Sequence, residues 1–439
     1  MARHSSRRSA PRIARVPLSL APSLLVGAAL TGTASAHHGF GNFDTNQEIT
    51  LKGTVSRIDF VNPHAYVYFS VTGTDGAKAP YRCEMRAATV LRRSGWSAEM
   101  FKPGDPITIT GAPDRFDAYS CYVNTIVFAD GTKADRYAQL SKPAQSAAPA
   151  ASARPARLPS GEPNISGDWA PEQVVMTDPR GKSGALVPVS QVGNYKPGER
   201  PAPPPGGGGF GRPRVDYTAA GKEAADKFRN FSPEDNPRMR CETTSILFDW
   251  TFDGPVDRIT QSGDTITLQY GQYGFTRTIH LNAEHPAKIE PSRAGHSTGR
   301  WENDVLVVDT VGFAPGVLNP PIMNSAQLHV IERFEFDASA IKIKRSYTAT
   351  DPVIFNGEYT GSDTIGVADL PYAPDKCEEL TDHSHTPASP PGAPPPQLAG
   401  AAGAPTTAGA AGSAAAPSSA AAEKPAQPKS WWKFWEWWN

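Results

Sequence analysis

Apolar and polar residues alternate along much of residues 37–140, the pattern of strands that bury one face. β-Branched and aromatic residues fill the apolar positions of "ITLKGTVSRIDF" and "AYVYFSV", as strands favour. A helix is predicted over residues 87–96, where Gly95 is suited to end it. Five strands are predicted, over residues 49–60, 65–71, 80–85, 105–113 and 120–131. This order of elements predicts a small barrel of the OB type, and a half-open sandwich is the alternative.

Alternation returns in residues 161–382, after one predicted helix over residues 217–231. Turn signals such as Asn303-Asp304 separate short apolar runs. Strands are predicted within residues 244–250, 257–281, 299–313, 328–350 and 353–361. A meander of this kind predicts a larger antiparallel barrel or a strongly curved sheet. The whole chain is therefore predicted to be all-β, with two β domains.

Low-complexity segments separate and follow these domains. Residues 141–160 and 383–428 are rich in Ala and Pro and hold too few large apolar residues to form a core. We interpret the first as a linker and the second as a tether to a short tail, residues 429–439. The Pro- and Gly-rich residues 196–214 are predicted to be a loop inside the second domain.

Residues 1–36 have the features of a signal peptide. Five arginines precede an apolar run, and Ala34-Ser35-Ala36 offers a small-x-small cleavage site. An uncleaved anchor is the alternative, although the run is short for a membrane span. Cleavage after Ala36 would leave 38 basic and 44 acidic residues, a balance that argues against a nucleic-acid partner. We expect a periplasmic or secreted protein.

The chain has four cysteines, which an exported protein is expected to use in disulfides. Three pairings are possible. The local one joins Cys83 to Cys121 and Cys241 to Cys377, so that each bridge lies inside one predicted domain.

Two resemblances follow from specific strings. "AHHGFGNFD", "LKGTVSRIDFVNPHAYVYFSV" and "LRRSGW" make the N-terminal domain resemble the family known as domain of unknown function 6152, small exported bacterial proteins. The resemblance implies architecture and an exported location, and no reaction. "GHSTGRWENDVLVVDTVGF" is similar to a motif of large, mostly uncharacterised exported bacterial proteins, whose β-rich domain is similar to lipocalin-type barrels.

Cleavage after Ala36 would make His37 the first residue, with His38 beside it. The free amine and ring of an N-terminal histidine can chelate copper, and His64 of "NPHAY" could add another imidazole. Nitrogen-rich sites favour Cu²⁺ among first-row ions. His37, His38 and His64 are therefore predicted metal ligands. The alternative is an unstructured chain end and a His64 that only hydrogen-bonds a turn.

The string "GHSTGRWE" concentrates chemistry in the second domain. Alternation predicts that His296, Thr298 and Arg300 share one side of a strand, and an inward Arg300 could receive an anion or polarise a carbonyl. In the alternative, Trp301 plugs the barrel and Arg300 covers it. The candidate catalytic residues are His296, Arg300 and Glu302, and the candidate ligand-binding residues are His280, His329 and Arg333. Glu332 and Arg333 are expected to face water, as charges in strands usually do.

The tail "KSWWKFWEWWN" has an unusual density of tryptophan, a residue that prefers membrane–water interfaces. We expect it to contact a membrane surface or an envelope protein, and a groove of the second domain is the alternative. The tryptophans concerned are Trp431, Trp432, Trp435, Trp437 and Trp438.

These observations favour an exported binding protein that holds copper and a small apolar or amphiphilic ligand. The alternatives are an exported enzyme that acts on a carbonyl or ester substrate, and an envelope scaffold. The chain contains no nucleophile-elbow, phosphate-loop, dinucleotide-binding or H-E-x-x-H motif.

Overall fold

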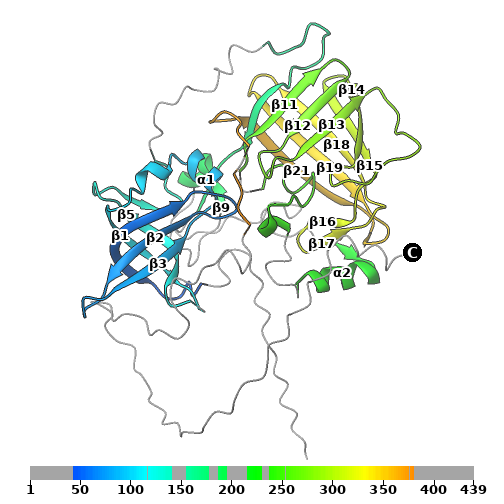
Figure 1. Cartoon of the computed structure of the whole chain (residues 1–439). Helices are drawn as coiled ribbons and strands as arrows, with labels where there is room; N and C mark the ends of the chain where they lie inside the picture. The colour runs from blue at the N-terminus through cyan, green and yellow to red at the C-terminus, as the bar shows by residue number, and fades with distance from the viewer. Residues whose placement is uncertain are drawn as a thin grey trace, which may run out of the picture. The chain divides into compact units, whose positions relative to one another are not determined.

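Two β-barrels form the described part of the chain, shown as a computed structural model in Figure 1. The structure describes residues 43–115, 117–140, 155–176, 186–194, 215–229, 237–252, 254–374 and 376–379. Several predicted features lie outside these residues: the signal peptide, His37 and His38, most of the linker, the 196–214 loop, the tether and the tryptophan tail.

The first barrel closes in the order β1-β2-β3-β5-β4, with β6 added beside β5. Closure comes from a parallel pairing of β3 with β5, in which Cys83 lies opposite Cys121. The helix lies between the third and fourth strands, so the predicted OB-like barrel is confirmed. Its elements are β1 (Ile49–Asp59), β2 (Tyr66–Thr72), β3 (Lys78–Glu84), α1 (Ala88–Arg93), η2 (Ala98–Met100), β4 (Pro106–Pro113), β5 (Ser120–Val127) and β6 (Lys133–Asp135).

Alternate residues of these strands form one apolar core. Val67, Phe69 and Val71 of β2 are buried, and Ile107 and Ile109 of β4 pack in the same cluster. The two-residue spacing is that of side chains on one face of a strand, which is why the sequence predicted these strands well.

The second barrel is also closed, and it contains nine strands in the order β11-β12-β13-β14-β15-β18-β19-β21-β7. This confirms the predicted larger barrel. One neighbouring pair is parallel: β13 and β14 run in the same direction, and residues 282–295 cross between them. The strands are β7 (Gly167–Pro171), β11 (Asp257–Ser262), β12 (Thr265–Gln269), β13 (Thr276–Leu281), β14 (His296–Glu302), β15 (Val305–Val311), β18 (His329–Asp337), β19 (Lys342–Thr350) and β21 (Tyr359–Val367).

Smaller elements accompany the second barrel. The predicted helix 217–231 is observed as α2. Gly221 of this helix lies against the backbone of Ile354, where a Cβ atom would meet the Ile354 carbonyl oxygen at 1.7 Å. The elements are β8 (Val174–Met176), β9 (Leu186–Pro188), η4 (Val189–Asn194), β10 (Asp216–Tyr217), α2 (Ala219–Arg229), η6 (Pro237–Arg240), β16 (Gly316–Asn319), β17 (Ile322–Asn324) and β20 (Phe355–Asn356).

The prediction of a strand over residues 244–250 is wrong. Residues 246–250 form turns, and Ile246 and Trp250 are fully buried in the core of the second barrel. Local hydrogen bonds explain the difference: Ser245 Oγ accepts from the backbone N–H groups of Leu247 and Phe248, and Asp249 accepts from those of Thr244 and Ser245. Side chains that satisfy the backbone in this way compete with strand formation.

The expectation that Glu332 faces water is also wrong. Glu332 is fully buried, and its carboxylate oxygens lie 2.5 Å from Arg277 Nη2 and 3.3 Å from Arg345 Nη1. Arg277 also donates to Ser297 Oγ at 2.8 Å, and Arg345 donates to the carbonyl oxygen of Ile246 at 2.9 Å. Because each buried charge is paired and hydrogen-bonded, this interior network can be retained in a core.

Both disulfides have the local pairing. Cys83 is bonded to Cys121, and Cys241 to Cys377. Disulfides persist in oxidising compartments, so the pairs fit an extracellular or periplasmic location. Among the described residues, no helix has the length and apolar character needed to cross a bilayer.

Candidate functional site

His64 of the predicted metal set is held by a buried carboxylate. His64 Nδ1 lies 2.7 Å from Glu84 Oε1, and 27% of the His64 side chain is exposed. The other oxygen of Glu84 accepts a hydrogen bond of 3.1 Å from the Tyr66 hydroxyl. Burial raises the pKa of Tyr66 well above its ordinary value, and the negative charge of Glu84 raises it further. Tyr66 therefore remains a hydrogen-bond donor and helps to fix the carboxylate.

Strand register explains why these groups meet. Tyr66 of β2 lies opposite Glu84 of β3, and Glu84 lies opposite Tyr122 of β5. His64 precedes Tyr66 by two residues, a spacing that repeats the same side of an extended chain. Asn62 anchors the turn before His64, because its side-chain amide bonds to Thr89 in the first turn of α1. The "NPH" string thus places an imidazole at the end of a strand.

The described chain begins near the His64–Glu84 pair. Phe43 pairs with Asp114, and its ring centre lies 5.3 Å from that of Tyr122. Tyr122 is in turn the register partner of Glu84. His37 and His38 lie outside the described residues, so their positions relative to His64 stay a prediction.

A second group of imidazoles lies on the second barrel. His280 of β13 is opposite Thr298 of β14, and Thr298 is opposite Asp309 of β15. His296 precedes Thr298 by two residues and therefore shares its side of β14. This side is the outer one, because the neighbouring Ser297 faces the buried network. We call His280, His285, His296, His329 and Asp309 the imidazole cluster.

Hydrogen-bond distances join the members of this cluster in a chain. The Nδ1 atoms of His285 and His296 are 2.8 Å apart. His285 Nε2 lies 3.3 Å and His329 Nε2 lies 2.9 Å from the same oxygen, Asp309 Oδ1. The ring of His280 stacks on that of His296, with centres 5.2 Å apart. Burial lowers the pKa of His296 below its ordinary value of 6.5, and the positive charges of His285 and His280 when protonated lower it further.

The structure does not gather all the predicted catalytic and ligand-binding residues in one place. Arg300 is exposed on the outer side of β14, where its Nη2 lies 2.6 Å from Glu302 Oε1. Arg333 reaches the other oxygen of Glu302 at 3.2 Å. His296 contacts His285 and takes no part in the exposed ion pairs that Glu302 forms with Arg300 and Arg333. The predicted inward Arg300 is therefore not observed, while Trp301 is half-buried and packs against the barrel core.

Two members of the imidazole cluster were missed among the predicted site residues: His285 and Asp309. Alternation in "VLVVDTV" could have placed Asp309 on the outer face opposite Thr298, since Leu306 and Val308 are buried. His285 gave no comparable signal, because it belongs to the crossing segment between two strands whose parallel pairing alternation does not reveal.

Neither histidine group is a ready-made metal centre in the described part of the chain, where no three His, Cys, Asp or Glu side chains stand as a group that could hold an ion. Each group nevertheless presents imidazole nitrogens, which transition metals commonly bind, next to a carboxylate.

A family model described as "Family of unknown function (DUF6152)" matches residues 25–120. The N-terminal part of the chain therefore resembles that family, and the match ends where β5 begins. No curated protein and no solved structure matches the chain. These comparisons assign no activity to either barrel.

Proposed function

We propose that this chain is an exported copper-binding protein, whose first barrel holds the ion through His64, His37 and His38. In this proposal a peptidase removes residues 1–36 and frees the amine of His37. The two disulfides are consistent with an oxidising compartment, where such processing occurs.

The observation that carries the proposal is the contact of 2.7 Å between His64 Nδ1 and Glu84 Oε1. The contact puts a negative charge beside Nδ1, and Nε2 of the same ring is the atom that we propose as the ligand. Histidine ligands of metals usually have such a partner, because it orients the ring and increases its basicity. Glu84 is itself fixed by the hydrogen bond from Tyr66, so its carboxylate stands beside the ring of His64 before an ion arrives.

Chain length supports the participation of the N-terminal histidines. His37 precedes Phe43 by six residues, and six extended residues span at most about 20 Å. Phe43 packs on Tyr122, the register partner of Glu84. The N-terminal segment therefore starts beside β3, the strand that carries Glu84. A terminal amine, the His37 ring and one or two further imidazoles form a nitrogen set that suits Cu²⁺.

The test is a Cu²⁺ titration of the chain that begins at His37, followed by electron paramagnetic resonance. We expect one tightly bound ion with nitrogen ligands. One extra glycine before His37 should abolish the chelate while leaving every side chain in place. His64→Ala should remove one imidazole from the spectrum, and Glu84→Gln should weaken binding about 10- to 100-fold through misorientation of His64.

The matched control is Glu99→Gln, because Glu99 lies in η2, outside the His64–Glu84–Tyr66 contacts, and removes the same charge. It should bind copper as the unaltered chain does. The proposal fails if the glycine-extended chain and His64→Ala both keep the affinity and spectrum of the unaltered chain.

A further inference from the structure

The turn that leads into β2 is held by a segment that is distant in sequence. The backbone N–H of Asn62 donates to the carbonyl oxygen of Lys376 at 3.1 Å, and the Asn62 carbonyl oxygen accepts from the N–H of Glu378 at 3.0 Å. Asn62 and Cys377 therefore form a parallel β-bridge. We call residues 376–378 the bridging segment. It supplies a partner for both backbone polar groups of Asn62, a residue that is only 4% exposed.

A disulfide fixes the bridging segment. Cys377 is bonded to Cys241, which directly follows η6. A buried ion pair of 2.6 Å joins Arg238 of η6 to Asp249, within the turns 246–250 that enter the core of the second barrel. The bridging segment is therefore attached to a buried part of the second barrel, and the cross-link limits how far it can move away.

His64 lies between two backbone anchors. After it, the carbonyl oxygen of Ala65 accepts from the N–H of Met85 at 2.8 Å, a contact inside the first barrel. Before it, Pro63 has no N–H to donate, so Asn62 is the nearest upstream residue with both backbone groups. The hydrogen bonds from the bridging segment to Asn62 therefore complete the anchor on the N-terminal side of His64.

The side chain of Asn62 has a different partner. Its Nδ2 atom donates to Thr89 Oγ1 at 3.1 Å, and its Oδ1 atom accepts from the Thr89 N–H at 3.3 Å. The first turn of α1 thus holds Asn62 mainly through the side chain, and the bridging segment holds it mainly through the backbone. A substitution that removes one backbone donor of the bridging segment can separate the two contributions.

From these contacts we infer that the bridging segment is a positioning element for the imidazole of His64. The Cys241–Cys377 disulfide keeps this element in place. The inference rests on the proposed copper site, for which it identifies a support supplied by the second domain. The contact of 2.7 Å between His64 and Glu84 requires a fixed backbone, because a hydrogen bond weakens steeply when its length or angle changes.

The test removes one backbone hydrogen bond and compares the result with loss of the side chain alone. Glu378→Pro eliminates the N–H that donates to Asn62. Its matched control is Glu378→Ala, which keeps the N–H and removes only a carboxylate paired with Lys376 at the surface, at 3.3 Å. A second variant replaces both Cys241 and Cys377 by alanine and so frees the bridging segment from its support.

The first measurement needs no copper. Nitrogen nuclear magnetic resonance of the chain that begins at His37 reports the two ring nitrogens of His64, with His64→Ala to assign them. We expect these signals to change in Glu378→Pro and in the double cysteine variant, and to stay the same in Glu378→Ala. The second measurement is a Cu²⁺ titration, in which the first two variants should bind about 10-fold more weakly, as expected when the support of a ligand is lost.

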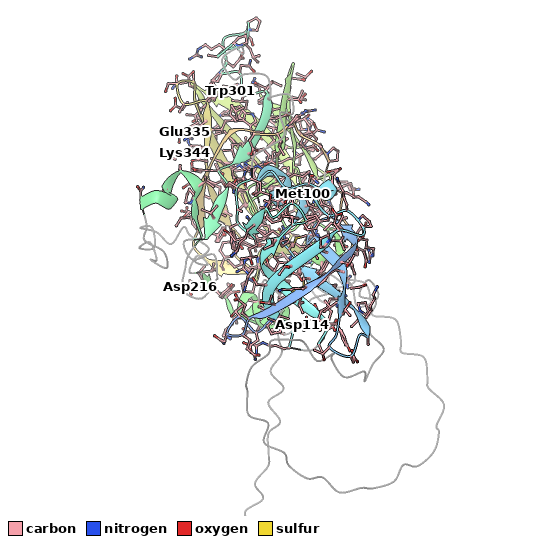
Figure 2. All side chains as sticks on the ribbon, turned by 90° about the vertical axis from the view of Figure 1, so that its left-hand side faces the viewer. Met100, Asp114, Asp216, Trp301, Glu335 and Lys344 are labelled. Carbon is pink, nitrogen blue, oxygen red and sulfur yellow. A yellow bond between two sulfur atoms is a disulfide. The ribbon has the colours of Figure 1, made fainter. Side chains whose placement is uncertain are left out.

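A further control lies on the second barrel. Glu335→Gln removes an exposed carboxylate of β18 that lies 3.9 Å from Lys344 Nζ of β19 (Figure 2). It should leave both the His64 signals and the copper affinity unchanged. Thermal unfolding of each variant identifies any loss of fold, and Glu378→Pro decides the question if the double cysteine variant does not fold.

His64 signals that stay unchanged in Glu378→Pro would overturn the inference. Equal changes in Glu378→Pro and Glu378→Ala would overturn it as well, because the backbone contact would then have no special role. If the unaltered chain binds no copper, the proposed function fails, and the ring signals of His64 in the copper-free protein still decide whether the bridging segment positions this side chain.

Discussion

The two barrels fill their interiors in different ways. In the small barrel, Phe69 and the Cys83–Cys121 disulfide belong to an interior cluster of apolar side chains. The large barrel encloses Arg277 and Glu332 as well as its apolar cluster. In the small barrel Glu84 lies outside the apolar cluster, beside His64, whose side chain is 27% exposed.

This difference shows that buried charge alone does not mark a binding site. Both oxygens of Glu332 are paired with arginines, so the network serves the fold. Glu84 contacts one imidazole and one hydroxyl, and that imidazole faces solvent. In the small barrel His64 is the described side chain that the copper proposal uses. Three variants test this contrast, in decreasing order of their expected effect on stability.

Glu332→Ala tests the interior of the large barrel. The substitution leaves Arg277 with uncompensated buried charge, while Arg345 keeps its contact with Asp363. Loss of the partner of Arg277 costs about 3–5 kcal/mol of the free energy of unfolding. Urea unfolding followed by tryptophan fluorescence measures the loss. Glu335→Gln, on the outer side of the same strand, should change the stability by less than about 0.5 kcal/mol. Equal effects of the two substitutions would remove the distinction between the inner and outer charges.

Replacing both Cys83 and Cys121 by alanine tests the β3–β5 pairing that closes the small barrel. The bridge joins residues 38 positions apart across the pairing of β3 with β5. Loss of such a cross-link lowers the stability by about 2–4 kcal/mol, chiefly by enlarging the unfolded ensemble. Calorimetric unfolding should show the transition of the small barrel shifted and that of the large barrel unchanged. A shift of both transitions would contradict the separate roles of the two interiors.

Arg300→Ala tests the exposed ion pairs of Glu302 with Arg300 and Arg333, and it should have the smallest effect on stability. The hydrogen bond from Arg300 holds the pKa of Glu302 below its ordinary value of 4.5. A lowered folded pKa contributes stability above pH 4.5, and this contribution is lost as the pH falls through the folded value. Nuclear magnetic resonance titration should show the Glu302 pKa rising in the variant, with no measurable change in the unfolding midpoint at neutral pH. A large drop in that midpoint would contradict this prediction and show that the ion pairs of Glu302 stabilise the fold.

Much of the fold could be predicted because strand periodicity is a local signal. Residues 49–60 and 328–350 contain long alternations, and both contain the expected strands. Alternation also assigns the residues of β14 correctly to the two sides of the strand, but it does not say which side faces the barrel interior. Glu332 shows what could decide this, since Val330 and Phe334 on the same side are buried. Two apolar neighbours at this spacing outweigh one charge.

The imidazole cluster could be predicted only in part, because it depends on long-range pairing. His280 and His296 meet through the parallel contact of β13 with β14, and His285 reaches them from the crossing segment. No local pattern in the chain encodes that direction of pairing. The His64 contact is similar: "NPH" indicated a turn, but its partner Glu84 follows from the register of β2 with β3.

The first barrel is proposed to hold a copper ion through its outward histidine, His64. The decisive experiment is a Cu²⁺ titration of the chain that begins at His37 and of two variants, His64→Ala and His285→Ala. We expect His64→Ala to change the tight Cu²⁺ site and His285→Ala to leave it intact. Unchanged Cu²⁺ binding in His64→Ala, or equal losses in both variants, would rule the site out.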